Sequence, residues 1–188
     1  MSPLLQTFAN GSALGYRSLS AAAGTAFESI ATVTVGSTSV ANIEFTSIAS
    51  TYTHLQIRLI NLSSSAGTNL ELRFNSDTGN NYDTHWLYGS GSSATAGAAA
   101  NLDYVWAAGA GSSTAPAGVV VDILDYRNTN KYKTVRTLGG YDTNGGGYIY
   151  FTSGLWRNTN AITSLKITCN ANFNQYSQVA LYGIKVAS

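Results

Sequence analysis

Charged side chains are scarce in this sequence. Only 10% of its 188 residues are Asp, Glu, Lys or Arg, whereas soluble domains carry charge on about a quarter of their residues. The 10 basic and 9 acidic residues leave a formal net charge of +1. A nucleic-acid-binding protein would show a clustered basic face, and no run of like charge occurs here. We therefore expect no nucleic-acid partner.

Cysteine and long apolar runs are also missing. The single Cys169 excludes an internal disulfide, and with it the disulfide-stapled folds of small secreted proteins. Because Cys169 shares one side of a predicted strand with Ile167, we expect it to be a small buried hydrophobic residue. The apolar runs are far below membrane-spanning length, and the first residues lack the features of a signal peptide. The sequence therefore predicts no membrane insertion.

Residues that build catalytic sites are few and scattered. The two histidines, His54 and His85, are expected on different strands. No nucleophile elbow, phosphate-binding loop or Cys/His metal spacing is present. A glycan-cleaving enzyme would need two acids facing one groove, and Asp122 and Asp125 are expected on opposite faces of one strand. We expect no enzymatic activity and no cofactor.

A glycan-cleaving enzyme built from other acids stays open as an alternative. It would require the fold to bring together some of Asp77, Asp83, Asp103 and Asp142.

Uncharged polar residues take the place of the missing charges. Ser, Thr, Asn, Gly and Tyr favour β-strands and the turns between them. From Phe27 onward, apolar and polar residues alternate with period 2, most clearly in residues 70–74. No segment shows convincing helical periodicity. Strands are expected at 30–35, 40–47, 55–62, 70–74, 82–88, 102–107, 119–126, 133–138, 148–151, 162–169 and 178–186.

About ten short strands joined by long loops predict an all-β fold. The spacing favours an antiparallel β-sandwich of the jelly-roll type over residues 27–188. The glycine-rich turn 144–147 predicts a hairpin. Residues 90–100 are rich in Gly, Ser and Ala, so we expect them to form a surface loop.

Residues 1–26 differ from the rest of the chain. Small residues and glycines separate a few apolar anchors, which are Leu4, Leu5, Phe8, Leu14 and Tyr16. Such a segment has little core of its own, so we expect it to be ordered only against a partner or a neighbouring subunit. We interpret it as an extended N-terminal docking segment, with a leader of no function as the alternative.

One stretch resembles a metal-binding loop. Residues 75–83 place oxygen-bearing side chains around Gly79, which is an arrangement that can surround a calcium ion. Asp77 and Asp83 are its candidate ligands. The same residue types are those that tight turns require, and the terminal Glu of a calcium loop is missing. We therefore favour a turn over a metal site.

Aromatic residues are abundant, with twelve tyrosines and three tryptophans. A sugar ring can lie on an aromatic face while Asn and Asp bind its hydroxyls, and jelly rolls include many lectins. Alternatively, the rings fill the sandwich core or a subunit interface, where Tyr and Trp are enriched. The candidate glycan or partner contacts are Tyr82, Trp86, Tyr88, Trp106, Tyr141, Trp156 and Arg157.

Several ordered segments carry a family resemblance. They are 48–58 (IASTYTHLQIR), 72–82 (LRFNSDTGNNY), 122–137 (DILDYRNTNKYKTVRT), 153–159 (SGLWRNT), 161–167 (AITSLKI) and 179–185 (VALYGIK). Through these segments, residues 27–185 resemble the β-sandwich virion proteins of tailed bacteriophages, of the tail-fibre or capsid decoration type. The resemblance supplies no catalytic residues.

The resemblance implies a virion structural protein, made in the cytoplasm of a bacterial host and displayed on the particle surface. We expect a homo-oligomer, a trimer, anchored to capsid or tail proteins by residues 1–26. Its distal loops would face the host, as a tail fibre in contact with a surface glycan. One alternative is a capsid decoration (cement) protein that stabilises the head. Another is a carbohydrate-binding module with no role in a virion.

Overall fold

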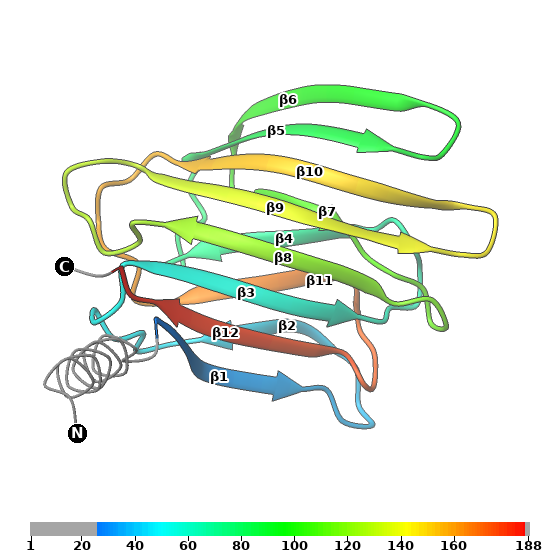
Figure 1. The fold of residues 1–188 in the computed structure, drawn as a ribbon, viewed down its shortest axis with the longest axis horizontal. Coiled ribbons are helices and arrows are strands. Elements are labelled where there is room, and N and C mark those ends of the chain that lie inside the picture. The colour runs from blue at the N-terminus through cyan, green and yellow to red at the C-terminus, as the bar shows by residue number, and fades with distance from the viewer. Residues whose placement is uncertain (1–25, 187–188) are drawn as a thin grey trace, which may run out of the picture.

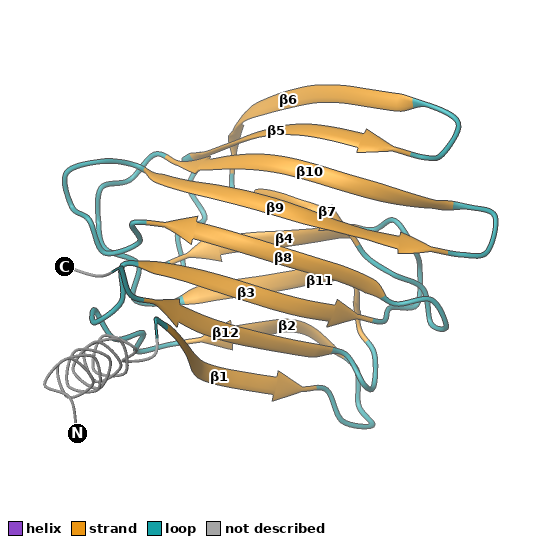
Figure 2. Cartoon of the chain, in the orientation of Figure 1, coloured by secondary structure: helices purple, strands orange, loops and turns teal. Residues whose placement is uncertain are grey.

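The computed structural model describes residues 26–186, which form twelve β-strands and no helix (Figures 1 and 2). The predicted docking segment, with Leu4, Leu5, Phe8, Leu14 and Tyr16, lies outside the described residues. The strands are β1 (Phe27–Thr34), β2 (Val40–Phe45), β3 (His54–Asn61), β4 (Asn69–Phe74), β5 (Tyr82–Gly89), β6 (Ala94–Leu102), β7 (Val105–Gly109), β8 (Ala117–Leu124), β9 (Lys133–Asp142), β10 (Gly147–Trp156), β11 (Leu165–Phe173) and β12 (Gln178–Ile184). Within residues 26–186 there is no helical segment with the length and apolarity to cross a membrane.

The alternation in the sequence determines which face of each strand is buried. In β3, the side chains of Leu55, Ile57 and Leu59 enter the core, and the residues between them point outward. Successive side chains of a strand point to opposite faces, so a period of 2 produces one apolar face. The predicted burial of Cys169 is confirmed, and burial raises the pKa of its thiol.

The strand order is that of a jelly roll. One sheet contains the run β1-β12-β3-β8, and the other contains β2-β11-β4-β7. With the hairpins β5–β6 and β9–β10 set aside, the chain crosses between the sheets at every connection except that from β4 to β7. This is the wrapping of an eight-stranded jelly roll. All strand pairs are antiparallel, and the predicted antiparallel β-sandwich of the jelly-roll type is confirmed.

The two additional hairpins extend only one of the sheets. β9 pairs with β8, and β10 pairs with β5, so the first sheet grows to the order β1-β12-β3-β8-β9-β10-β5-β6. The second sheet keeps four strands and ends at β7, which lies against β9 and β10. Figure 1 shows β5 and β6 extending past the smaller sheet. The inner face of the larger sheet is therefore covered over only part of its width.

The structure corrects the expectation for residues 90–100. They form the turn after β5 and most of β6, in place of a surface loop. Pairing with β5 stabilises this strand, because strand propensity depends on the neighbouring strand more than on composition. The predicted hairpin at 144–147 is confirmed, with Asn144 and Gly145 at positive φ between β9 and β10.

A buried lysine holds two loops together. The side chain of Lys133, at the start of β9, is fully buried. Its Nζ donates hydrogen bonds to the main-chain oxygens of Asn128 at 2.6 Å, Lys131 at 3.1 Å and Thr159 at 3.0 Å. The ammonium thereby ties the β8–β9 loop to the segment that follows β10.

Replacement of Lys133 by Met should destabilise the fold strongly. The variant keeps most of the apolar volume but removes the donor of three main-chain carbonyls at once, which costs about 2–4 kcal/mol. Chemical denaturation monitored by tryptophan fluorescence measures the loss. Lys131→Met is the matched control, because the Lys131 side chain is more than half exposed and should contribute less than about 0.5 kcal/mol. Equal stability of the two variants would contradict this role of Lys133.

Candidate functional site

A cluster of aromatic side chains lies on the part of the larger sheet that the smaller sheet leaves open. β5, β9 and β10 supply five of the rings from the inner face, and β7 supplies one from the edge of the smaller sheet. We call this cluster the aromatic groove, and its residues are Trp86, Tyr88, Trp106, Tyr141, Tyr148 and Tyr150.

Each ring of the groove contacts the next ring along the surface. The ring of Trp106 lies 5.4 Å from that of Trp86 and 5.5 Å from that of Tyr150, both edge to face. The rings of Tyr148 and Tyr150 stack at 5.8 Å, and Tyr141 lies 5.9 Å from Tyr148. Such offset and edge-on pairs are the favoured aromatic geometries. The contacts form a continuous surface from β5 to the tip of the β9–β10 hairpin.

Two adjoining hollows run along this surface. One, of about 350 Å³, is lined by four tyrosines and Trp106, with Gly67 beside them. The other, of about 270 Å³, is lined by Trp86, Tyr104 and Asn69, and it shares Tyr88 and Trp106 with the first. The groove is therefore long enough to place more than one ring-shaped ligand unit against aromatic side chains.

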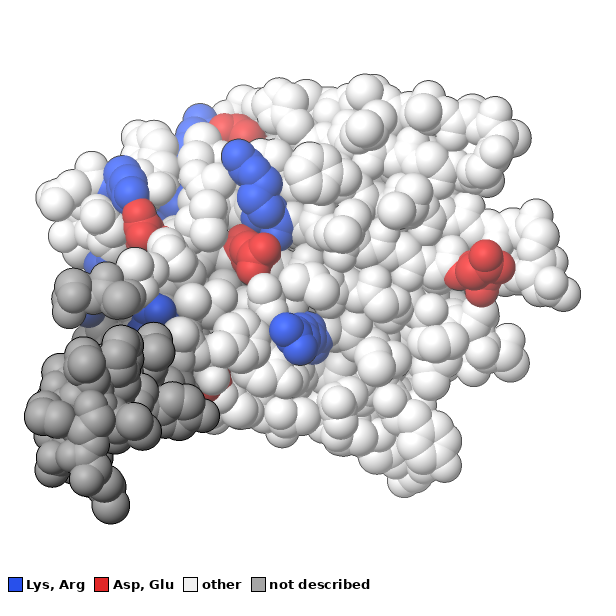
Figure 3. All heavy atoms as spheres, in the orientation of Figure 1, with Lys and Arg blue, Asp and Glu red and all other residues white. Residues whose placement is uncertain are grey.

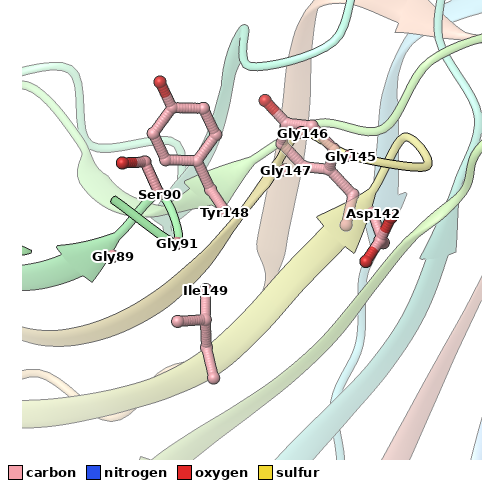
Figure 4. Close-up of a pocket in the computed structure, with 10 residues that line it drawn as sticks. Gly89, Ser90, Gly91, Asp142, Gly145, Gly146, Gly147, Tyr148 and Ile149 are labelled. Atoms are coloured by element: carbon pink, nitrogen blue, oxygen red, sulfur yellow. The ribbon is translucent and has the colours of Figure 1, made fainter. Parts of the chain in front are cut away.

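A third hollow, of about 340 Å³, lies between the tips of the two hairpins. It shares Tyr141 and Tyr148 with the aromatic groove and adds Ser90 and Asp142 as hydrogen-bonding groups. Figure 4 shows Tyr148 and Ile149 pointing away from β10 in opposite directions. The Asp142 carboxylate accepts a hydrogen bond from the Asn144 amide at 2.7 Å through Oδ1. The hairpin tips thus add polar partners at one end of the groove.

Two glycines make room for the rings. A Cβ atom at Gly97 in β6 would lie 2.5 Å from the indole of Trp86. A Cβ atom at Gly109 in β7 would clash with the phenol ring of Tyr150. Real Cβ atoms do not approach other heavy atoms so closely, so only glycine fits while the rings keep their positions.

The two aromatic hollows have an uncharged lining, with no Asp, Glu, Lys or Arg among the residues that form them. Burial raises the pKa of Tyr141 and Tyr150, and the neighbouring phenols raise that of Tyr150 further. The hydroxyls therefore stay protonated at neutral pH. The indole Nε1 of Trp106 has no hydrogen-bond partner among the described residues. This surface suits a neutral ligand with an apolar face and hydroxyl groups.

The structure brings together four of the predicted contact residues. Trp86, Tyr88, Trp106 and Tyr141 come from three strands and line the same groove. None of them is fully buried. The aromatic side chains at these four positions thus form part of one continuous surface.

For two other residues the structure corrects the prediction of a contact role. Tyr82 and Trp156 are at most 1% exposed and belong to the core. Tyr82 and Trp156 pair with each other at the end of β5 and β10 that lies away from the groove. There Phe74 of the smaller sheet packs on Trp156 at 5.5 Å and on Tyr82 at 6.3 Å. Burial raises the pKa of Tyr82 to about 12. The two ends of one strand pair therefore have different environments, because the smaller sheet covers only one end.

Arg157, another predicted contact residue, is not among the residues that line the two aromatic hollows. Its guanidinium donates hydrogen bonds to the main-chain oxygen of Asn80 at 2.6 Å and to Oδ1 of Asn101 at 2.7 Å. Its Nε lies 3.3 Å from Oδ2 of Asp83. The side chain is thus engaged in joining the loop before β5 to the end of β6.

The metal alternative at residues 75–83 is not supported by the contacts of its carboxylates. Asp77 accepts hydrogen bonds from the amide of Gly79 at 2.9 Å and from the indole of Trp156 at 2.8 Å. Burial opposes its ionisation, but these bonds and one from Asn81 outweigh burial and lower its pKa. Asp83 accepts a bond from the Asn101 amide at 2.9 Å. The stretch is a turn whose acids bind protein donors.

The remaining acids are dispersed. Asp103 pairs with Arg73 at 2.7 Å, and Asp122 accepts a hydrogen bond from Gln56 at 2.8 Å. Asp125 was expected on the same strand as Asp122, but β8 ends at Leu124, so Asp125 lies in the following turn, where it pairs with Lys131. Within residues 26–186, no group of three or more His, Cys, Asp or Glu side chains is arranged to hold a metal ion.

Tyr148 and Tyr150 belong to the groove but are missing from the predicted contact residues. Both lie on the inner face of β10, two positions apart. Their spacing in the sequence could have predicted that the two rings share a surface, since a period of 2 places both on one face of a strand. The sequence could not tell which end of the strand the smaller sheet leaves open.

No protein-family model matches the sequence, and a search of curated proteins finds no match.

Replacement of Gly97 by Ala should displace the indole of Trp86. The added methyl group would overlap the ring, so we expect a loss of about 1–3 kcal/mol in unfolding free energy and a change in the near-ultraviolet circular dichroism of the aromatic groove. Gly118→Ala is the matched control, because a Cβ atom there meets no atom within 4 Å. An unchanged spectrum for Gly97→Ala would show that the groove does not depend on this glycine.

Proposed function

We propose that this chain is a non-enzymatic virion structural protein of a tailed bacteriophage, displayed on the particle surface as a host-recognition domain. In this proposal the aromatic groove binds a neutral glycan of the host surface. The observation that carries the binding function is the uncharged row of aromatic rings on the open inner face of a jelly roll.

The chemistry of the groove favours a sugar over other ligands. The apolar C–H face of a pyranose ring packs on an aromatic ring, and its hydroxyls bind neutral donors and acceptors. The protonated phenols of Tyr141 and Tyr150 supply such groups, and Asn69, Ser90 and Asp142 lie at the ends of the groove. A phosphate or nucleic-acid ligand would require basic side chains, which the lining of these hollows lacks.

The virion setting is supported by the family resemblance and by the low charge. A neutral surface rich in Ser, Thr, Asn and Tyr suits close packing beside identical or different subunits. In this proposal residues 1–26 dock the domain onto capsid or tail proteins, and the groove faces away from the particle. The protein acts as an oligomer, which gives each particle several binding sites.

A capsid decoration protein is the second candidate, and a specific observation favours it. Leu87, Leu138, Ile149 and Phe151 are each more than half exposed on the outer face of the larger sheet. Contiguous exposed apolar side chains mark protein-protein contact sites. A cement protein would bury such a face against capsid subunits.

Glycan binding should depend on Tyr148. This ring is 38% exposed and contacts Tyr88, Tyr141 and Tyr150. We expect the full chain to bind at least one neutral oligosaccharide on a bacterial glycan array. Tyr148→Ala should weaken that binding about tenfold or more, because the sugar would lose apolar contact area worth about 25 cal/mol per Å².

Tyr132→Ala is the matched control for this experiment. Tyr132 is about half exposed but lies in the β8–β9 loop, at the opposite end of β9 from the hairpin tip. Its removal should leave the affinity unchanged. An equal loss of glycan affinity in both variants would contradict the glycan proposal. The absence of binding by the full chain at millimolar sugar would contradict it as well.

The position and copy number of the protein on purified particles separate the candidates. A few copies at the tail, located by cryo-electron microscopy with quantitative mass spectrometry, are the expected result for a host-recognition protein. Hundreds of copies over the head would identify the decoration protein. Absence from the particles would leave a carbohydrate-binding module and reject the virion role.

A further inference from the structure

The terminal strand β6 leaves one edge of the larger sheet open. It is the last strand in the sheet order and pairs with β5 alone. From Ala94 to Ala99 its register with β5 is regular, and a shift appears only beyond Ala99. Every second residue of such a strand directs its backbone N–H and C=O away from its partner. The open side of β6 therefore presents a row of unused hydrogen-bonding groups.

The other three sheet edges carry features that hinder pairing. The register of β1 shifts between Ser29 and Ala31. β2 has only six residues and includes Glu44, and β7 has five residues and a register shift opposite it in β4. Short edges, bulges and charges are the usual means by which proteins prevent edge-to-edge association.

β6 has none of these features over its regular part. It is the longest edge strand, with nine residues, and its sequence ATAGAAANL contains no charge and no proline. Six of the nine residues are Ala or Gly, so no side chain blocks the approach of another strand. We infer that β6 pairs antiparallel with β6 of a second copy of this chain, which joins the two larger sheets about a two-fold axis.

The side chains beside β6 favour a second copy as the occupant. Across the outer face, Ala96 lies opposite Leu87, Leu87 opposite Phe151, and Phe151 opposite Leu138. In Figure 3 the half of this face on the right is white apart from one acidic group. Two such regions meet without like-charge repulsion. After pairing, the Leu87 side chains of both copies flank a narrow seam of alanines.

The symmetry of this pairing sets the size of the assembly. A contact of one patch with the same patch on a second copy closes after two subunits. The inference therefore replaces the expected trimer with a dimer, and it does not rest on the proposed glycan binding.

Sedimentation of the full chain at micromolar concentration tests the inference. We expect the mass of a dimer. The double variant Ala96→Lys and Ala98→Lys places four positive charges at the seam, and it should raise the dissociation constant at least about tenfold. Both alanines are exposed on the outer face, so the fold should persist. Circular dichroism verifies that it does.

The matched control places two lysines on the opposite edge of the same sheet. Thr32 and Thr34 of β1 are exposed, and Thr32→Lys with Thr34→Lys should leave the dimer intact. Hydrogen exchange gives a second readout, because the β6 amides should become protected as protein concentration rises. A monomer or a trimer of the full chain would overturn the inference, as would a dimer that the β6 lysines do not weaken.

Discussion

The structure depends on a mismatch between two hydrogen-bonded sheets. Eight strands pair in one sheet and four in the other, so the smaller sheet cannot cover the inner face of the larger one. Burial against the smaller sheet produces the core, where Leu55, Ile57 and Phe74 are fully enclosed. Where that cover ends, the same inner face carries aromatic rings with partial access to solvent. Core and groove are thus two parts of one surface, separated by the edge of β7.

Aromatic residues suit this position because they tolerate both environments. A phenol or indole ring buries a large apolar area, and its polar atom still forms hydrogen bonds. Along β10, exposure falls from Tyr148 through Tyr150 to Trp156, so the rings pass gradually from groove to core. Lys133 has a related role at the start of β9, where its apolar stem is buried and its ammonium donates hydrogen bonds to three main-chain carbonyls.

Alternation in the sequence was sufficient to predict the fold class and most strands, because the period of 2 follows directly from strand geometry. It failed for β6, whose small residues form a strand only because β5 lies beside them. The aromatic count pointed to a binding surface, but Tyr82 and Trp156 belong to the core. Which end of a strand is covered depends on the length and position of the opposite sheet, and no local pattern encodes that.

The two hairpins also make the groove modular. β4 and β7 are neighbours in the smaller sheet, so excision of β5–β6 would leave an ordinary hairpin, and β8 could still cross to β11 without β9–β10. Five of the six groove rings lie within these two inserted segments. The ligand preference can therefore change through substitution of the β5–β6 and β9–β10 hairpins alone. The eight-stranded framework and the residues of its core would stay the same.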